Sequence, residues 1–304
     1  MDAGHRRGGD VVNRATRSPA WRDCALAALV PYVPYLWLLL FFAAPFVLVA
    51  VISAGDAAPD ATPPIAFTGS GGSYARLVGD PLYIAAYIGS LRIAALSTLL
   101  ALLIGYPMAY AIARAPESWR AGLLAAVILP FWTPFLIRVY AWTGLLSENG
   151  LVNQLLRGTG VAENPGTILG TEWAVCLGIA YAYLPFMVLP LYATLVKLDG
   201  ALLEAAADLG APPWRAFLTV TLPLSLPGVA GGCLLVFIPA VGEVIVPDLL
   251  GGADTLMIGK VLWDEFFANG DWPAASAVAV AMLVMLVLPV MALQRARGRA
   301  LERR

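Results

Sequence analysis

Long apolar runs alternate with shorter polar segments along the whole chain. Each run exceeds twenty residues. The six runs cover about Ala25–Ser53, Tyr87–Ala113, Gly122–Leu146, Trp173–Val196, Leu224–Pro247 and Pro273–Leu293. A membrane-spanning helix needs roughly 20 apolar residues, and runs of this length are too long for the strands of a membrane barrel. The pattern therefore predicts an all-α integral membrane protein with six transmembrane helices.

Prolines and glycines interrupt some of these runs. The third contains Pro130 and Pro134, so a kink is expected there. The fifth contains Pro239 and Gly242 just before Glu243. A broken membrane helix exposes backbone groups that must face protein or a cavity. Pro239 and Gly242 are therefore hinge candidates, although both residue types are common in membrane helices.

The polar segments divide the chain into three parts. Residues 1–24 form a basic N-terminal tail, residues 25–293 a six-span domain, and residues 294–304 a basic C-terminal tail. The first apolar run is too long for the core of a signal peptide, which favours an uncleaved span. The loop after the third span carries a predicted surface helix at Leu151–Leu156.

Composition supports a membrane protein and excludes several other classes. The residues are 60% hydrophobic and 13% charged, whereas soluble domains carry roughly 25% charged residues. The net charge of −1 gives no reason to expect nucleic-acid binding. The single histidine lies in the N-terminal tail, and the three cysteines are far apart and are interpreted as packing residues. No metal site and no catalytic site is predicted.

The basic residues predict the orientation of the chain. With both termini in the cytoplasm, fourteen of the nineteen Lys and Arg fall in inner segments, and only Arg76, Arg157 and Lys260 fall in outer loops. Inner loops of membrane proteins carry an excess of basic residues. We therefore expect a multi-pass membrane protein with both termini in the cytoplasm. The outer loops have a net charge of −8, which suits an acidic vestibule or reflects the usual acidity of translocated loops.

A charged segment on the cytoplasmic side, Glu204–Pro223, predicts two short helices. The first ends at Gly210, which can adopt the left-handed conformation, and the second runs from about Trp214 to Val220. Pro223 should stop the second helix. A polar helix–turn–helix between two spans, within a loop over residues 197–223, is typical of a surface that binds a partner.

The spacing within this segment resembles the EAA signature of the MetI-like family of ABC importer permeases. Glu204, Ala205 and Ala206 precede Gly210 by the expected gap, and nine residues later Val220-Thr-Leu-Pro replaces the usual Ile-x-Leu-Pro. The small alanines allow a close approach to a groove, and the glutamate can pair with a basic partner or cap the helix. The candidate residues for coupling to an ATPase are Glu204, Ala205, Ala206, Asp208, Gly210, Trp214 and Arg215.

Four further stretches resemble polyamine importer permeases, those of the putrescine (PotH) type more closely than those of the spermidine/putrescine (PotB) type. They are Leu129–Trp142, Tyr181–Tyr192, Phe237–Gly252 and Met257–Ala279. The resemblance implies import of a polyamine, putrescine first, from periplasm to cytoplasm by alternating access. It also implies a second homologous permease, a cytoplasmic ATPase dimer and a periplasmic polyamine-binding protein. ATP and Mg would be bound by the ATPase, because the nearest approach to a phosphate loop, Gly252–Lys260, has the wrong spacing.

Three ionisable residues, Arg92, Arg138 and Glu243, lie inside predicted spans near the outer face. Each is costly in lipid and should face protein or water. Glu243 and Asp248 could form an anionic step for an entering diamine. The alternative is a structural pair of Glu243 with Arg138 or Arg92. The candidates for the translocation path are Glu243, Asp248, Arg138, Tyr181 and Tyr183.

The last outer loop mixes acidic and aromatic residues in Trp263, Asp264 and Glu265. These suit ammonium recognition, a contact with the binding protein, or a belt at the membrane interface. Other cargoes of the same permease class, such as spermidine, sulfate or iron, stay open. A secondary transporter should show internal repeats, and none is convincing here. A membrane enzyme would need a nucleophile, metal ligands or an acid pair within the spans, and the inventory offers none.

Overall fold

A computed structural model describes residues 32–58, 60–159 and 168–302 of the chain. The chain divides into two compact units, one ending at Val51 and the other beginning at Ile52. The first described helix has three parts: α2 (Tyr32–Leu38), a π-helical turn η1 (Leu39–Ala43) and α3 (Ala44–Ser53). Together they form a largely apolar helix of 22 residues that lies within the predicted first span. The start of that span and the N-terminal tail lie outside the described residues.

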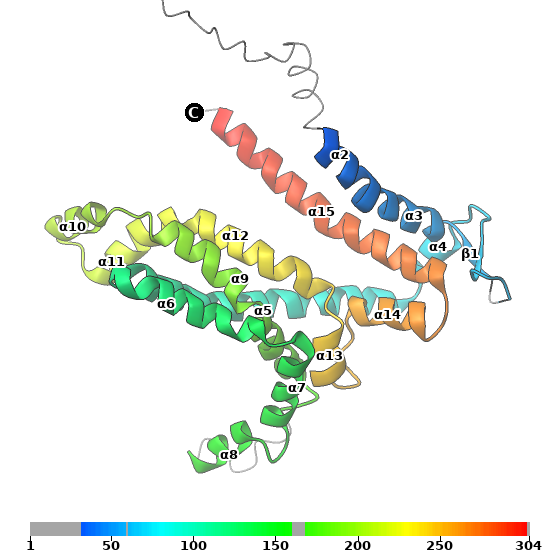
Figure 1. The fold of residues 1–304 in the computed structure, drawn as a ribbon, viewed down its shortest axis with the longest axis horizontal. Coiled ribbons are helices and arrows are strands. Elements are labelled where there is room, and N and C mark those ends of the chain that lie inside the picture. The colour runs from blue at the N-terminus through cyan, green and yellow to red at the C-terminus, as the bar shows by residue number, and fades with distance from the viewer. Residues whose placement is uncertain (1–31, 59, 160–167, 303–304) are drawn as a thin grey trace, which may run out of the picture. The chain divides into compact units, whose positions relative to one another are not determined.

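Three long helices pack against one another and form the core of the second unit (Figure 1). They are α5 (Pro81–Arg114), α9 (Glu172–Leu195) and α12 (Leu222–Val241). Two of them begin at side-chain caps: Asp80 accepts a hydrogen bond from the Leu82 N–H at 2.9 Å, and Thr171 accepts one from the Ala174 N–H at 3.3 Å. Such caps satisfy donors that the first turn of a helix leaves free.

A methionine and two glycines set the spacing of these core helices. Met187 of α9 is fully buried. A Cβ atom on Gly105 would lie 3.0 Å from its Cγ, and one on Gly232 would lie 2.7 Å from its Sδ. Glycine therefore lets α5 and α12 approach α9 closely, as small residues do in membrane helix bundles.

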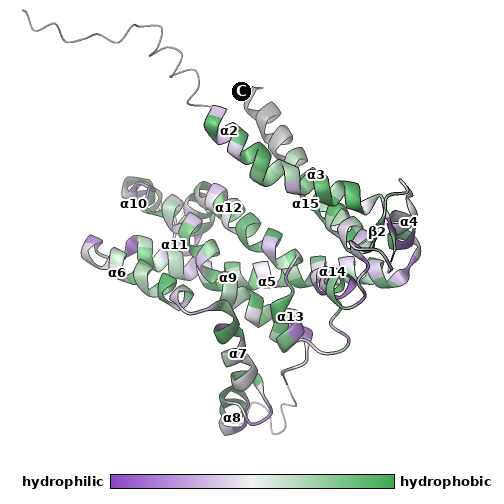
Figure 2. Cartoon of the chain, turned by 45° about the vertical axis from the view of Figure 1, so that its right-hand side comes forward, coloured by the Kyte–Doolittle hydropathy of each residue, from purple (hydrophilic) through white to green (hydrophobic). Residues whose placement is uncertain are grey.

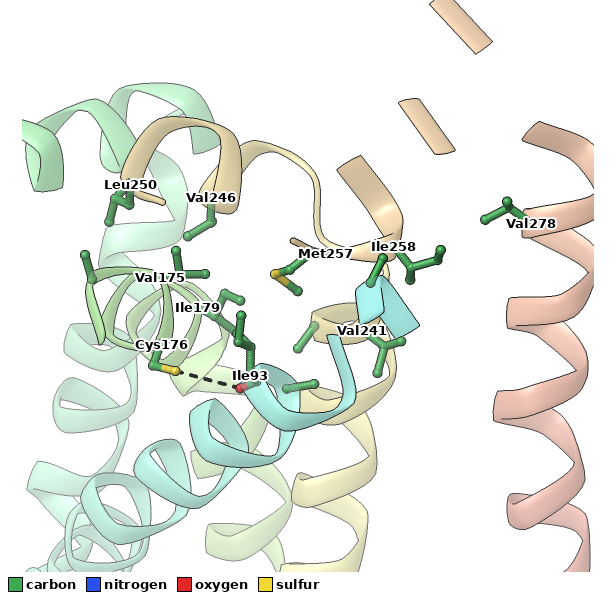
Figure 3. Packing of buried hydrophobic residues seen from close by; sticks show 14 of the residues in the cluster. Ile93, Val175, Cys176, Ile179, Val241, Val246, Leu250, Met257, Ile258 and Val278 are labelled. Carbon is green, nitrogen blue, oxygen red and sulfur yellow. Dashed lines mark hydrogen bonds between the residues drawn. The ribbon is translucent and has the colours of Figure 1, made fainter. Parts of the chain in front are cut away.

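A second apolar cluster extends the core toward the C-terminal end of α12. In Figure 3, Ile93 of α5 lies near Cys176 and Ile179 of α9, and the Cys176 thiol is 4.0 Å from the Ile93 carbonyl oxygen. The buried side chain of Cys176 agrees with its interpretation as a packing residue. The half-buried Cys233 packs against the cluster of buried residues that contains Met187, and Cys24 is outside the described residues.

The predicted third span is broken rather than kinked. Its helices are α6 (Glu117–Ile128), a 3₁₀ turn η2 (Leu129–Trp132) and α7 (Phe135–Leu146), followed by α8 (Leu151–Gly158). Glu117–Trp132 and Phe135–Gly158 are bent by 90° from each other. The cause is local: Thr133 precedes Pro134 and is extended, with ψ of 144°, because a following proline disfavours helical geometry. The surface helix predicted at Leu151–Leu156 lies within α8.

The predicted boundaries of the fifth span are wrong at both ends. Pro223 does not stop a helix: α11 (Pro213–Ala216), a π-helical turn η3 (Phe217–Thr221) and α12 run on as one helix of 29 residues. Proline lacks an N–H and collides with the carbonyl four residues earlier, and the wider π turn lies at that position. At the other end α12 stops at Val241, and Ile245–Leu250 forms a separate helix, α13.

Further elements precede α5 or follow α13 along the chain. A small antiparallel pair, β1 (Asp56–Ala57) and β2 (Ile65–Ala66), precedes α4 (Gly72–Gly79). The predicted loop 251–272 contains a helix, α14 (Ile258–Phe267). The last helix, α15 (Trp272–Glu302), includes the predicted sixth span and continues through most of the predicted tail. The boundary expected at residue 294 is therefore not a structural break.

Among the described residues, four helices are long and apolar enough to cross a membrane: Tyr32–Ser53, Pro81–Arg114, Glu172–Leu195 and Pro213–Val241. The bent pair in the third predicted span is a further candidate, and Trp272–Leu288 is a shorter apolar helix. Figure 2 shows hydrophobic residues along α3, α9 and α12. The described helices overlap the six predicted apolar runs, although only four of them, or five with the bent pair, are long enough to count as spans.

Candidate functional site

A cavity of about 670 Å³ lies where α12 ends and α13 begins. Its walls come from five helices, α7, α9, α12, α13 and α14, together with the break between α12 and α13. The lining residues are Leu136, Tyr140, Tyr183, Pro239, Gly242, Glu243, Val244, Ile245, Asp248, Leu249, Lys260, Trp263 and Asp264. The combination of carboxylates, aromatic rings and one ammonium group distinguishes it from the apolar packing around it.

Glu243 lies in the break itself and is only 7% exposed. The Tyr183 hydroxyl donates a hydrogen bond of 2.5 Å to its Oε2, and the backbone N–H of Ile245 donates one of 3.2 Å to its Oε1. The side chain thus caps the start of α13 and is tied to α9. Within the described part of the chain, no ion pair involves Glu243.

The two arginines considered as structural partners of Glu243 form no ion pair with it among the described residues. Arg92 forms an ion pair with Glu172 at the start of α9. Arg138 lies over the ring of Phe131, 4.4 Å from its centroid, and 5.6 Å from that of Phe135. Its buried Nε and Nη1 have no hydrogen-bond partner among the described residues.

Asp248 and Lys260 form an ion pair at the more exposed part of the cavity. The Lys260 Nζ lies 2.9 Å from the Asp248 Oδ1, and the two side chains are 37% and 57% exposed. Lys260, Trp263 and Asp264 follow one another at helical spacing on α14, so they share the face that lines the cavity. Lys260 was not among the site residues predicted from the sequence, although this spacing is visible in the sequence.

The cavity brings together seven of the residues that the sequence proposed: Glu243, Asp248, Tyr183, Trp263, Asp264, Pro239 and Gly242. Three others lie elsewhere. Arg138 is outside the lining, Tyr181 packs edge-on against Trp142 with ring centroids 5.4 Å apart, and Glu265 accepts hydrogen bonds from Tyr83 and Asn269. Leu136 and Tyr140, which the sequence analysis missed as lining residues, come from α7 and reach the cavity through the 90° bend.

The break at Gly242 is held by α14. A Cβ atom on Gly259 would lie 2.5 Å from the Gly242 carbonyl oxygen and 2.7 Å from that of Glu243. The start of α14 is fixed to α5 by the Ile258 N–H, which donates a hydrogen bond of 2.8 Å to the buried Ser90 hydroxyl. The proposed hinge at Pro239 and Gly242 therefore cannot open without moving α14.

A second, smaller hollow of about 320 Å³ is formed near β1 and the end of α14 by Ala57, Arg76, Glu265, Asn269, Gly270 and Asp271. The Arg76 guanidinium donates to Asp271 at 2.6 Å, and this hydrogen bond raises the pKa of Arg76. The nearby Asp56 accepts hydrogen bonds from the hydroxyls of Ser70 and Thr68, which lower its pKa. The Arg76–Asp271 contact ties the polar segment before α5 to the one after α14, whereas the hydrogen bonds of Asp56 stay within the segment before α5.

At the opposite end of α12, α10 (Gly200–Asp208) and α11 form a short helix–turn–helix. Asp199 caps α10 by accepting a hydrogen bond of 3.0 Å from the Ala201 N–H. Gly210 has φ of +78°, and the Ala211 N–H reaches back to the Ala206 carbonyl at 3.0 Å. This is the left-handed helix ending predicted for Gly210.

Most predicted coupling residues of this segment are exposed. Glu204, Ala205, Asp208, Gly210, Trp214 and Arg215 are exposed, whereas Ala206 is buried. Trp214 is 62% exposed and Leu209 is 89% exposed. The Arg215 guanidinium lies 5.6 Å from the centre of the Trp214 ring. The segment therefore presents apolar and charged groups together, beside a hollow of about 260 Å³ that reaches Tyr110 of α5.

Phe217 connects this segment to the core. Its ring stands edge-on to Tyr106 and Tyr110 of α5, with centroids 5.6 and 6.1 Å apart. The Tyr106 hydroxyl also shares a hydrogen bond of 2.8 Å with Ser225 of α12. The π turn that carries Phe217 is thus fixed between α5 and α12.

Comparison with known proteins places these features in one family. The family model described as "Binding-protein-dependent transport system inner membrane component" matches residues 24–303. The spermidine/putrescine transport system permease protein PotB of Haemophilus influenzae is 42% identical over 260 residues, covering 86% of this chain and 90% of that protein. PotB of Escherichia coli is 43% identical over 224 residues, covering 74% and 81%.

Solved structures agree on the fold. A bacterial ABC transporter involved in the import of the acidic polysaccharide alginate has a TM-score of 0.67 at 19% identity, covering 92% of this chain and 98% of that chain. The MetNI methionine ABC transporter has a TM-score of 0.53 at 18% identity, covering 71% and 94%. The predicted MetI-like helical fold is confirmed.

Proposed function

The chain belongs to the family of binding-protein-dependent transport system inner membrane components, and from this membership we propose that it moves polyamines across the bacterial inner membrane. It is an ABC importer permease subunit and is not itself an enzyme. The proposal concerns its cargo, its partners and its cycle. Putrescine is the first candidate and spermidine the second, and both appear in the names of the PotB relatives.

One observation carries the choice of cargo: Glu243 is almost fully buried at the cavity wall, and its charge has no cationic partner among the described residues. Asp248 and Asp264 add carboxylates, and Tyr183 and Trp263 add aromatic rings. An ammonium group that loses its water needs such carboxylates or ring faces in exchange. An anion such as sulfate would meet an excess of negative charge in the same cavity.

The α10–α11 segment is proposed as the contact with the ATPase dimer. The positive-inside distribution supports a cytoplasmic location for both termini and for this segment, and the cavity would then lie toward the outer face. ATP and Mg would be bound by the ATPase. A second homologous permease would complete the pathway, and a periplasmic binding protein would deliver the polyamine.

One continuous helix joins the α10–α11 segment to the cavity. The helical run from Pro213 to Val241 begins in the α10–α11 segment and ends at the cavity. At about 1.5 Å per residue its 29 residues measure about 43 Å. Closure of the ATPase dimer around ATP would displace α10 and α11, and this helix would carry the displacement to the break at Gly242. Release of the polyamine inward would follow by alternating access.

The test is uptake by the complete transporter reconstituted in vesicles, with labelled putrescine, spermidine and sulfate compared in the presence and absence of ATP. We expect ATP-dependent uptake of the two polyamines and none of sulfate. Uptake of sulfate in place of polyamine would reject the cargo. Polyamine uptake that needs no ATPase subunit would instead favour a secondary transporter.

A further inference from the structure

The side chain of Lys260, which lines the cavity, carries the same chemical group as the ends of the proposed cargo. Its side chain ends in a primary alkylammonium group, and this group lies 2.9 Å from the Asp248 carboxylate. Both residues line the cavity, together with Trp263 and Asp264 from the same helix as Lys260. The terminal groups of a linear polyamine are primary alkylammonium ions of the same kind.

The position of Lys260 is fixed by its neighbour. Gly259 packs directly on the carbonyl groups of Gly242 and Glu243, so that a Cβ atom would not fit. The Ile258 N–H is hydrogen-bonded to Ser90 of α5. The Lys260 backbone is therefore held at the break, and only its flexible side chain is free to leave Asp248.

The ion pair itself is easy to exchange. Both side chains are partly exposed, at 37% for Lys260 and 57% for Asp248. Ion pairs that water can reach contribute little stability because water and other ions compete for both groups. An incoming ammonium group can take the place of the lysine without leaving a buried charge unpaired.

We propose that the ammonium group of Lys260 occupies the binding site of one substrate ammonium group. It is bound to Asp248 while the cavity is empty and is displaced when a polyamine enters. The inference rests on the proposed function, because it takes the cargo to be a polyamine. A tethered group competes at an effective concentration in the millimolar range. Lys260 thus lowers the affinity for every cation that uses Asp248 by the same factor. Cations that make no further contact with Glu243, Asp264 or the aromatic rings then bind too weakly to fill the cavity.

The experiment measures binding of labelled spermidine by equilibrium dialysis to the assembled complex of both permeases and the ATPase, without the soluble binding protein. The variants are Lys260→Gln, Asp248→Asn and the double variant. We expect K260Q to lower Kd by about two- to fivefold, the range that a partly exposed ion pair permits. D248N should raise Kd, and K260Q should have no additional effect in the D248N background.

Arg76→Gln is the matched control, because it breaks an ion pair with Asp271 that lies outside the cavity; its Kd should equal that of the wild type. The inference is overturned if K260Q leaves Kd unchanged, or if it lowers Kd by the same factor with and without Asp248, which would mean general repulsion by a positive charge. Uptake by the wild-type complex distinguishes a failure of the proposed function from a failure of the inference about Lys260. A wild type that transports no polyamine rejects the proposed function itself, whereas transport with unchanged Kd values rejects only the role of Lys260.

Discussion

The hydroxyl of Tyr183 donates a hydrogen bond of 2.5 Å to Oε2 of Glu243 and so joins core helix α9 to the break between α12 and α13. The second carboxylate oxygen accepts from the Ile245 N–H at 3.2 Å. Both donors are neutral, so they orient the carboxylate without cancelling its charge. A buried charge held in this way is costly unless a cation approaches it. This favours a mobile cation as the missing partner.

Replacing Glu243 with Gln tests whether the charge matters. Glutamine keeps the shape, and its amide oxygen can still accept a hydrogen bond, but the attraction to an ammonium group is lost. We expect polyamine uptake to fall by about tenfold or more, since hydrogen bonds to charged groups contribute roughly 1.5–3 kcal/mol. Uptake is measured in vesicles at equal amounts of assembled complex. Full uptake by E243Q would contradict a role for this carboxylate in the path.

Tyr183→Phe removes the hydrogen bond that positions the Glu243 carboxylate but leaves the charge of that carboxylate in place. The variant leaves one buried carboxylate oxygen without its donor, which costs about 1–3 kcal/mol. We expect a lower thermal midpoint for the purified complex, whereas E243Q should leave the midpoint close to that of the wild type. If Y183F melts as the wild type does, the hydrogen bond does not hold the break in place.

Gly259→Ala should disturb the break from the side of α14. The new Cβ atom would meet the carbonyl oxygens of Gly242 and Glu243 at 2.5 and 2.7 Å, and backbone atoms move less easily than side chains. Overpacking of this kind costs about 1–3 kcal/mol. We expect a lower thermal midpoint and reduced uptake. Gly122→Ala in α6 is the control, because no atom lies within 4 Å of its new Cβ; equal effects of the two changes would contradict the argument.

Hydropathy was sufficient to place the long helices, because an apolar run of twenty residues has few alternatives to a membrane helix. The ending of α10 at Gly210 was also predictable, since a left-handed residue after a run of helix formers favours glycine. The rule that proline stops a helix failed at Pro223, because the π turn beside Phe217 lies where the proline would otherwise collide with the helix. Single-residue rules do not include such a turn.

The partners of the charged residues could not be read from the sequence. Arg92 pairs with Glu172, eighty residues away, and this contact exists only because α5 and α9 pack together. The cavity depends on α14, whose apolar pattern is too short to stand out from a loop, and on the bend at Pro134. Its acidic and aromatic residues were each visible, but their assembly around Lys260 is a property of the tertiary structure.

Gly210→Ala should weaken the contact with the ATPase. The residue has φ of +78°, and a left-handed backbone costs an ordinary residue roughly 1–2 kcal/mol. We expect α10 to shift relative to α11, so that less ATPase copurifies and uptake falls. Gly210→Asn should restore part of both, because asparagine tolerates this conformation. Gly200→Ala, where a Cβ atom meets nothing within 4 Å, should have little effect; a loss equal to that of G210A would count against the backbone explanation.

Phe217→Ala should separate ATP hydrolysis from transport. The ring stands between Tyr106 and Tyr110 of α5, and each edge-on aromatic pair contributes about 0.5–1.5 kcal/mol beyond its buried area. Without it, the π turn can yield when α10 and α11 move, and less of that movement reaches the cavity. We expect hydrolysis by the assembled complex to persist while the amount of polyamine imported per ATP falls severalfold. Leu218→Ala removes the exposed neighbour on the same turn and should leave this ratio unchanged. If F217A loses hydrolysis and uptake in the same proportion, Phe217 holds the segment together but does not transmit its movement.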